Sequence, residues 1–537
     1  MLTRREMLAL QSMLAAGAFV GRPLELSGLF GSTASAQEPD WDAGELFHLL
    51  PTANHDRVLL KCSFQAPLPA TPELHVDGRR IAGQRTDTAG RFWAFDVASL
   101  RPSTAYTFEL RSGRGGALAE PWALTTFPAP DSEIDHVRIG FYHCAGGHEL
   151  SAVTHGRRTT IAVRRALLSK LASLQPAAIV ANGDHLYWDL YSPRFASIYA
   201  QSEEGLAYVG RFDRSQPIFG TPNEDFVLKG GVEQIAPLYR TMFRSTPVFF
   251  LQDDHDYFDN DDATDELFTF PPDHAMLALA RSVQKLAYPE FLPDPYRPRG
   301  LPGSREDEGR PEISSNFGTL RYGKLLEILL YDNRRSATLH GPTAVHFDHS
   351  VESWLNARMA DREVVHVVNA PGQPPGWTRG NWYEYYPDVV RDGQATVSEP
   401  KPYWPSGWLS QHDRIMQSIH RMPDRIPLVI SGDIHKSAHG RILRVGDVEM
   451  TDNPVVTLLP GTPGTGVASM LSAAVYTSNH LDMANEWGPL PENGFMIADF
   501  YQDRVECTFY TWDSRTQSID DIAALDPAYV TTLEPVA

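Results

Sequence analysis

Short motifs in this chain place aspartates beside other side chains that bind metals. Residues 182–184 read Asn-Gly-Asp, and Tyr187 follows three places after the aspartate. Residues 253–255 read Asp-Asp-His, and residues 432–435 read Gly-Asp-Ile-His. Each motif alone is most often a turn, a helix cap or a solvated acidic loop. Two Gly-Asp motifs with an Asp-Asp-His between them favour one shared metal site, since carboxylate, phenolate and imidazole groups all bind metals.

The elements that must position these residues are predicted to be buried strands. Apolar runs such as "AAIVANGD", "TPVFFLQDD" and "IPLVISGD" alternate with helical patterns such as "IAVRRALLSKLASL". This alternation indicates layers with a largely buried sheet, in which ligands bind at the carboxyl ends of the strands. Gly183 and Gly432 allow a sharp turn before each aspartate. The predicted strand ends carry Cys144, Asp184 with Tyr187, Asp254 with His255, Asp332 with Arg334, Asn369, and Asp433 with His435.

Composition restricts the functional classes. Of 537 residues, 42% are hydrophobic and 21% charged, as in ordinary globular proteins. The formal net charge of -20 repels a nucleic-acid backbone, so we expect no nucleic-acid-binding surface. An anionic substrate would need positive charge from elsewhere, and metal ions can supply it. Three cysteines, Cys62, Cys144 and Cys507, are too few for a disulfide scaffold and allow at most one pair.

The first 36 residues have the pattern of an export signal. Arg4 and Arg5 precede an apolar stretch, and Ala34 and Ala36 form an A-x-A cleavage site before Gln37. This order predicts a twin-arginine signal peptide over residues 1–36, rather than a basic helix start followed by a core helix. No later stretch reaches the roughly 20 apolar residues of a membrane span. We therefore expect a periplasmic or secreted protein that uses the twin-arginine export machinery and has no transmembrane segment when mature.

Two further segments follow the signal. Residues 37–129 contain short alternating runs separated by Gly, Pro, Asp and Thr, which predict a small all-β Ig/fibronectin-like sandwich. Pro102 and Tyr106 are spaced like the residues of a tyrosine corner. Residues 130–537 have the alternating strand and helix pattern and are predicted to form the catalytic domain.

The motifs from about residue 137 to 440 resemble those of calcineurin-like metallophosphoesterases, and more narrowly those of PhoD-type alkaline phosphatases. The resemblance rests on "NGDHLYWD", "QDDHDYFDND" and "SGDIHKS", and purple acid phosphatases share the Gly-Asp-x-x-Tyr pattern. It implies an α/β fold, with a four-layer α/β/β/α sandwich after the small all-β domain. The chain departs from the family at His143-Cys144-Ala145, where a Ser-Cys-Gln-like triplet is usual, and over residues 258–315, which match no family pattern.

The resemblance also implies two metal sites that share one aspartate. The first would be held by Cys144, Asp184, Tyr187 and His435. The second would be held by the bridging Asp184 with Asp254, Asn369 and Asp433. The mixed sulphur, phenolate and imidazole set suits iron, as Fe(III), whereas the all-oxygen set suits Ca²⁺, with Mn²⁺ or Mg²⁺ as alternatives.

The implied activity is hydrolysis of a phosphate ester by a hydroxide held between the two ions. His255 would protonate the leaving group, or alternatively would orient the ligand Asp254. Arg334 would hold the phosphate oxygens, with Arg157, Arg158 and Arg335 as the other candidates. His143 and His148 flank Cys144 and are more typical of loop residues than of ligands.

Two questions remain open at this point. The substrate is either a phosphomonoester, as for alkaline phosphatase, or a phosphodiester of a lipid, nucleotide or wall polymer, because the chemistry is shared. A different class of protein, a non-catalytic binding protein stabilised by metal, is disfavoured because a structural metal site has no use for His255.

Overall fold

The computed structural model describes residues 41–149, 156, 158–188, 212–257, 270–422, 424–466 and 474–536. The predicted signal peptide, residues 1–36, and Arg157 lie outside the described residues. Residues Glu38–Ala537 form one compact unit. Over the described parts, none of the helices combines the length and apolar character needed to cross a membrane.

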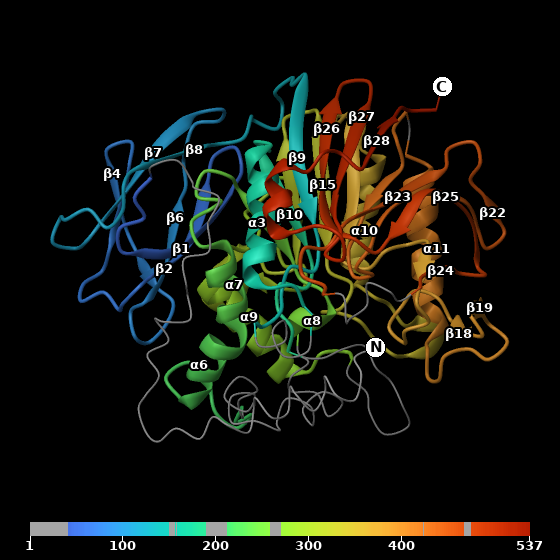
Figure 1. The fold of residues 1–537 in the computed structure, drawn as a ribbon, viewed down its shortest axis with the longest axis horizontal. Helices are drawn as coiled ribbons and strands as arrows, with labels where there is room; N and C mark the ends of the chain where they lie inside the picture. Colours follow the sequence, from blue (N-terminus) through green and yellow to red (C-terminus); the bar gives the residue numbers. More distant parts are fainter. Residues whose placement is uncertain are drawn as a thin grey trace. The chain divides into compact units, whose positions relative to one another are not determined.

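The first part of the described chain consists of two four-stranded sheets (Figure 1). One has the order β1-β2-β6-β5, with β1 Leu46–Ala53, β2 Val58–Phe64, β5 Gln84–Arg85 and β6 Phe92–Val97. The other has the order β4-β3-β7-β8, with β3 Glu73–Val76, β4 Arg79–Ala82, β7 Ala105–Arg111 and β8 Trp122–Thr125. Their inward side chains share one apolar cluster. The Tyr106 hydroxyl accepts a hydrogen bond from the Arg101 amide at 2.8 Å, as in a tyrosine corner. The strand content is as predicted, while the boundary of a separate domain at residue 129 stays a prediction.

A six-stranded sheet forms the first half of the larger part, in the order β11-β10-β9-β26-β27-β28. The first three strands in this order, β11, β10 and β9, are parallel, and the last three are antiparallel to their neighbours. Helix α3 connects β9 to β10, and its first turn is capped by the Thr160 side chain. The bounds are β9 His136–Tyr142, α3 Ile161–Ser173, β10 Ala178–Asn182, β11 Val248–Leu251, β26 Asn493–Tyr501, β27 Val505–Trp512 and β28 Tyr529–Leu533.

An eight-stranded sheet forms the second half, in the order β14-β15-β16-β20-β23-β21-β22, with β25 paired to β21. Strands β15, β16, β20 and β23 are parallel, so their carboxyl ends lie at one edge. The strand bounds are β14 Phe317–Tyr322, β15 Leu326–Tyr331, β16 His366–Pro371, β20 Leu428–Ile430, β21 Ser437–Val445, β22 Val448–Glu449, β23 Val455–Pro460 and β25 Leu481–Leu490. The helices of this half are α10 His349–Ala360 and α11 Ser406–His420.

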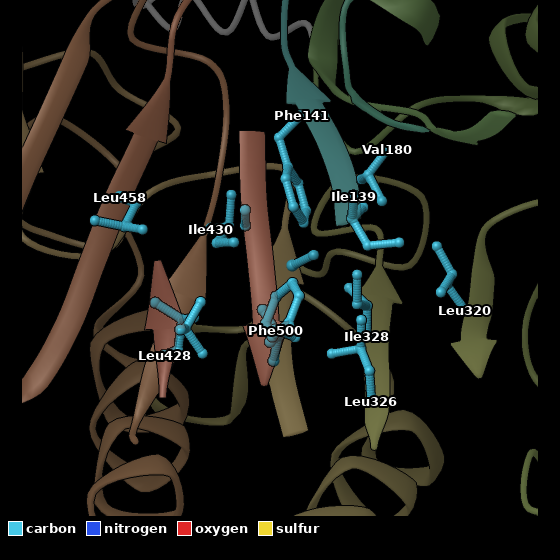
Figure 2. Close-up of a cluster of buried hydrophobic side chains, with 14 of the residues drawn as sticks. Ile139, Phe141, Val180, Leu320, Leu326, Ile328, Leu428, Ile430, Leu458 and Phe500 are labelled. Atoms are coloured by element: carbon cyan, nitrogen blue, oxygen red, sulfur yellow. The ribbon is translucent and has the colours of Figure 1, made fainter. Parts of the chain in front are cut away.

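The two large sheets pack face to face across the main core. Figure 2 shows Ile139 of the six-stranded sheet close to Ile328 of the eight-stranded sheet, and Phe500 of the six-stranded sheet beside Leu428 of the eight-stranded sheet. A second cluster packs α3, α7 and α9 on the outer face of the six-stranded sheet, and a third packs α10 and α11 on the outer face of the other. The predicted α/β/β/α sandwich is confirmed, because each sheet is apolar on both faces and needs a helix layer outside.

Smaller elements complete the described chain. The helices are α6 Pro222–Val227, the π-helix η3 Leu228–Val232, α7 Glu233–Tyr239, α8 Asp254–Tyr257, α9 His274–Ala287 and the 3-10 turns η4 Glu306–Glu308, η5 Gly341–Thr343 and η7 Ile519–Ala524. The two-stranded pairs are β12 Ser304–Arg305 with β13 Arg310–Ser314, β17 Trp377–Thr378 with β24 Tyr476–Thr477, and β18 Val389–Arg391 with β19 Gln394–Thr396. All three cysteines are buried free thiols.

The described part of segment 258–315 connects the small sheets to the rest of the unit. No pattern in its sequence predicted this role. Lys61 of β2 makes an ion pair with Glu290, 3.1 Å between Nζ and Oε2, and Arg281 of α9 approaches the same carboxylate at 2.7 Å. Leu59, Leu292 and Ile313 form a small apolar cluster at the same junction. The described part of the segment therefore packs the small sheets against the six-stranded sheet.

Replacing Ile328 by alanine should test the packing between the two large sheets. The side chain is fully buried in the shared core. Its truncation should lower the free energy of unfolding by about 2–5 kcal/mol, measured by denaturant titration. Val530→Ala on β28, where the residue is 56% exposed, is the matched control and should change it by less than about 0.5 kcal/mol. An equal effect of both changes would contradict this packing.

Candidate metal centre

The carboxyl ends of the parallel strands from both sheets meet at one place. Cys144 follows β9, Asp184 follows β10, and Asp253 and Asp254 follow β11. Asp433 and His435 follow β20 of the other sheet. Asn182, at the end of β10, donates from Nδ2 to the carbonyls of Pro371 at 3.0 Å and Ile430 at 3.1 Å. This one buried amide ties the end of one sheet to two strand ends of the other.

The first group of side chains contains sulphur, phenol, imidazole and carboxylate. Ligand atoms of Cys144, Asp184 and His435 all lie within 4.8 Å of one another. The Cys144 Sγ lies 3.1 Å from Asp184 Oδ2, and the Tyr187 hydroxyl donates to the same oxygen at 2.9 Å. That hydroxyl also lies 3.1 Å from His435 Nε2. The structure therefore brings together the four residues predicted to hold the first metal, which we call the mixed-ligand group.

The backbone at this site has a conformation that side chains rarely adopt. Cys144, Asp184, Asp433 and His435 have φ angles of 52°, 54°, 67° and 57°. A left-handed conformation at a non-glycine residue costs of order 1–3 kcal/mol, and it persists where surrounding structure holds it. Gly183 at φ +82° has no alternative, because a Cβ there would lie 2.6 Å from Asp253 Cβ. The turns after the strands thus aim four functional side chains at one point, at a cost in stability.

Asp256 holds the turn that carries Asp184. Its carboxylate accepts hydrogen bonds from the amides of Asp184 at 2.8 Å, His185 at 2.8 Å and Leu186 at 2.9 Å. It also accepts from the Asp253 amide at 2.9 Å, so the ends of β10 and β11 share one acceptor. Four buried amides converge on this side chain, which fixes both turns against each other.

Two neutral side chains, Gln234 and Thr465, support the mixed-ligand group through hydrogen bonds. The Gln234 Oε1 accepts from the amides of Gly147 at 2.8 Å and Tyr187 at 2.9 Å. The Thr465 Oγ1 lies 2.8 Å from His435 Nδ1, which leaves Nε2 facing Asp184 and Tyr187. A hydrogen bond to one ring nitrogen is the usual way in which a metal-binding histidine is oriented.

The second group of side chains offers oxygen alone. Carboxylate oxygens of Asp253, Asp254 and Asp433 lie within 4.8 Å of one another, and we call these three residues the carboxylate group. Asp254 also lies within this distance of Asp184 and His255, so Asp184 stands between the two groups. Asp253 was not among the predicted ligands. Gly372 makes room for it, because a Cβ at residue 372 would lie 2.8 Å from Asp253 Cγ.

Asn369, predicted as a ligand of the second metal, is not brought to the carboxylate group. Its strand partners Leu329 and Val429 belong to the outer apolar cluster under α10 and α11. Its Nδ2 lies 3.5 Å from the Met359 sulphur in that cluster. Alternation along β16 gives the reason: Val368, one residue earlier, faces the core between the sheets, so Asn369 faces the outer helices.

The electrostatics of the site fit bound cations. Asp184 Oδ1, Asp253 Oδ2 and Asp254 Oδ1 are buried and have no hydrogen bond within the described residues. Burial raises the pKa of Asp253 to about 6, against the opposing charge of Arg334, and raises the pKa of Asp254 well above its ordinary value. Burial also lowers the pKa of His435 to about 3, so its imidazole is neutral and able to bind a metal. Cations among these side chains would keep the buried carboxylates ionised and fill their unused lone pairs.

His255 lies at the junction of the two groups. Its Nε2 is 3.9 Å from Asp254 Oδ2, and its ring centroid is 4.3 Å from that of Tyr187. The side chain is 10% exposed, whereas those of Asp184 and Asp254 are 0% and 2% exposed. His255 is therefore the more accessible of these groups, which suits either of its two predicted roles.

The Arg334 side chain contacts carboxylates and is not exposed to solvent. Its Nε donates to Asp253 Oδ1 at 2.6 Å, and its Nη2 lies 3.4 Å from Asp433 Oδ2. Its Nη1 donates to the Tyr383 carbonyl at 2.9 Å, and the residue is fully buried. Asp332 accepts from the Arg334 amide at 2.6 Å and so orients the turn instead of binding metal. Arg334 is placed to hold the carboxylate group, and its predicted contact with phosphate oxygens has no support in these contacts.

Comparison with solved structures finds the same architecture elsewhere. The structure of PhoD matches with a TM-score of 0.57 and 13% sequence identity, over 92% of this chain and 90% of that chain. This chain has the PhoD fold. The purple acid phosphatase PPD1 from seeds of yellow lupin (Lupinus luteus) matches with a TM-score of 0.48 and 10% identity, over 91% of this chain and 73% of that chain. No protein-family model matches the chain, and no curated protein matches its sequence.

The likeness to PhoD confirms the predicted fold.

Five residues of the site were not predicted as functional from the sequence. They act through buried contacts and are Asn182, Gln234, Asp253, Asp256 and Thr465. Asp253 and Asp256 had a signal in the dense acidic run around His255, and Asn182 had one in the Asn-Gly-Asp motif, whereas Gln234 and Thr465 had none. His143, treated as a loop residue, contacts the Cys144 sulphur through Nδ1 at 3.0 Å, and His148 contacts Gln234 at 3.0 Å.

Asp256→Asn should test the shared turn. An amide offers one acceptor oxygen and would turn its own N–H groups towards backbone donors. The free energy of unfolding should fall by about 3 kcal/mol, measured by denaturant titration, because several buried amides lose their acceptor. Asp503→Asn, in a side chain that is 76% exposed, is the control and should be neutral. Wild-type stability of Asp256→Asn would show that the turn is held by other contacts.

Proposed function

We propose that this protein is a metal-dependent hydrolase of phosphoric esters. We further propose that it is exported through the twin-arginine pathway to the periplasm or the outside of the cell. The observation that carries the first proposal is that the mixed-ligand group and the carboxylate group meet at one residue, Asp184, with His255 beside them. The likeness of the fold to the structure of PhoD supports it. Its test is hydrolysis of nitrophenyl phosphate esters by the purified protein, followed by absorbance.

The donor sets suggest which ions the protein would hold. Cys144, Asp184, Tyr187 and His435 combine thiolate, carboxylate, phenolate and imidazole, which suits Fe(III). Asp184, Asp254 and Asp433 offer oxygen alone, which suits Ca²⁺, with Mn²⁺ or Mg²⁺ as alternatives. Asp253 takes the place for which Asn369 was predicted. Bound ions would supply positive charge against the phosphoryl oxygens and would lower the pKa of bound water.

The protein groups have separate roles in this proposal. His255 holds a proton at Nε2 and delivers it to the leaving oxygen of the ester, because its side chain is more accessible than those of Asp184 and Asp254 beside it. Asp184 fixes the separation of the two ligand groups. Arg334 pairs with Asp253 and Asp433 and limits their mutual repulsion. Phosphomonoesters and phosphodiesters both fit these roles.

Freshly purified protein should contain iron and either contain calcium or need it for activity. A visible absorption band from Tyr187 or Cys144 to Fe(III) should colour the protein. A chelator selective for calcium should abolish activity reversibly, because the carboxylate group holds its ion by hard oxygen donors alone. Elemental analysis, absorption spectra and reactivation by added calcium measure these outcomes. A colourless and fully active protein that contains zinc alone would remove the iron assignment.

His255→Ala should keep both metals and lower kcat by about 10²–10⁴-fold. The loss should be largest for alkyl phosphates and smaller for nitrophenyl phosphate, whose leaving group departs without a proton. A kinetic series over leaving groups of graded acidity, with metal analysis, measures this. His349→Ala, on a side chain that is 74% exposed, is the control and should behave like wild type. A ratio of wild-type to His255→Ala kcat that stays constant across the series would favour the alternative role of orienting Asp254. The same would follow if His255→Ala lost calcium and recovered its activity when calcium was added.

A further inference from the structure

Helix α3 carries a buried arginine, Arg164, that contacts the loop after Cys144. We propose that Arg164 is a positioning residue of the mixed-ligand group. Its guanidinium holds the loop that carries Cys144 and places a positive charge beside the anionic ligands, so that iron bound there is more easily reduced. This inference rests on the ion assignment of the proposed function and concerns how the protein controls that ion.

Arg164 ties helix α3 to the residues that follow Cys144. Its Nη1 donates to the carbonyl of Ala145 at 3.0 Å and to that of Gly147 at 2.9 Å. The Gly147 amide donates in turn to Gln234 at 2.8 Å. The loop is therefore held through its carbonyls by Arg164 and through an amide by Gln234. Because this loop begins at Cys144, these contacts fix where the thiol lies.

Local rules disfavour an arginine at this place. Arg164 is the fourth residue of α3, where the partial positive charge of the helix N-terminus opposes a cation. No part of the residue is exposed, and burial lowers its pKa to about 10. Two carbonyls need only two N–H groups, which a neutral amide side chain also has. The hydrogen bonds alone therefore do not require a charge.

The charge of Arg164 is only partly balanced by an ion pair. Its Nη2 lies 3.8 Å from Glu149 Oε2, and the Glu149 side chain is 42% exposed. That oxygen also accepts from the Ile161 amide at 2.7 Å, at the start of α3. Among the residues that the structure describes, Arg164 Nε and Nη2 have no hydrogen-bond acceptor. Ionised ligands would supply the missing negative charge, since Cys144 must lose its proton to bind a metal.

This charge bears on the ion that the group would hold. Thiolate, carboxylate and phenolate ligands bring three negative charges, which favour Fe(III) over Fe(II). A buried positive charge next to them opposes that preference, because solvent screens it little. Arg158, whose guanidinium carbon lies 3.4 Å from the centroid of the Tyr187 ring, adds to the same effect. Iron held beside Arg164 should therefore have a higher reduction potential than iron held by the same ligands without it.

The test compares iron-loaded wild type with Arg164→Met and Arg164→Lys. Methionine fills the buried space without charge or N–H groups, whereas lysine keeps the charge and loses the planar fork. Arg164→Met should bind Fe(II) about 10–100-fold more weakly, as for loss of a group that orients a metal ligand, and its reduction potential should fall. Arg164→Lys should bind Fe(II) more weakly while keeping a potential close to that of wild type. Competition with a chelator, the visible absorption band and a redox titration measure these outcomes.

Arg425→Met is the matched control. Arg425 is also buried and donates to carbonyls, from Nε to Val364 at 2.9 Å and from Nη1 to Met359 at 3.1 Å. It precedes β20, whereas the site follows the carboxyl end of that strand. Arg425→Met should lose stability in a denaturant titration, as Arg164→Met does. It should keep the absorption band, the iron affinity and the reduction potential of wild type.

The outcomes separate this inference from the proposed function. If Arg164→Met loses stability but keeps the iron affinity and potential of wild type, Arg164 only supports the fold and the inference is wrong. If Arg164→Met does not fold, Arg164→Lys decides: an unchanged Fe(II) affinity would overturn the positioning role, and a lowered potential would overturn the role of the charge. These measurements need no substrate, so a protein that binds iron but hydrolyses no phosphate ester would contradict the proposed function alone. A protein that binds no iron would overturn this inference, even if it hydrolyses phosphate esters with another metal.

Discussion

The burial of several carboxylates at one point is the constraint on which the rest of the structure depends. Asp184, Asp253 and Asp254 are buried close together, and their mutual repulsion opposes folding. Arg334, itself fully buried, balances only part of this charge. The remaining charge requires cations, and the left-handed backbone at Asp184 and Asp433 aims the carboxylates at the place where cations would lie. When no metal is bound, the strain and the unbalanced charge at the site therefore reduce the stability of the fold.

The stacking of the two large sheets meets this constraint. Parallel strands alone would bring all the ligands to one edge of one sheet. Two stacked sheets bring strand ends from both sides, which lets Asp184 stand between the mixed-ligand group and the carboxylate group. The apolar core between the sheets, shown in Figure 2, packs them together so that the carboxyl ends of their strands lie next to each other. The packing that stabilises the core therefore also determines where the ligand residues lie at the strand ends.

Much of this arrangement could be predicted from the sequence, because strand ends and Gly-Asp turns are local features. The buried apolar runs predicted the strands, and Asp184, Tyr187, Asp254, Asp433 and His435 all lie where the motifs placed them. Asn369 shows the limit of such reasoning. A shift of one residue along β16 decides whether a side chain faces the core or the outer helices, and the sequence near Asn369 is apolar on both sides. Arg334 shows another limit, since its partners come from segments about 80 and 100 residues away in the chain.

The amide of Asn182 has a consequence for the order in which the molecule assembles. It joins β10 to the ends of β16 and β20, which are separated from it by 189 and 248 residues of chain. Contacts of such long range form late, because a long loop must close before they stabilise anything. His435 likewise joins the mixed-ligand group from 248 residues after Tyr187, so the complete group is present only after both sheets have docked. Metal uptake would then follow the packing of the two sheets and would add to the apolar contacts that hold them together.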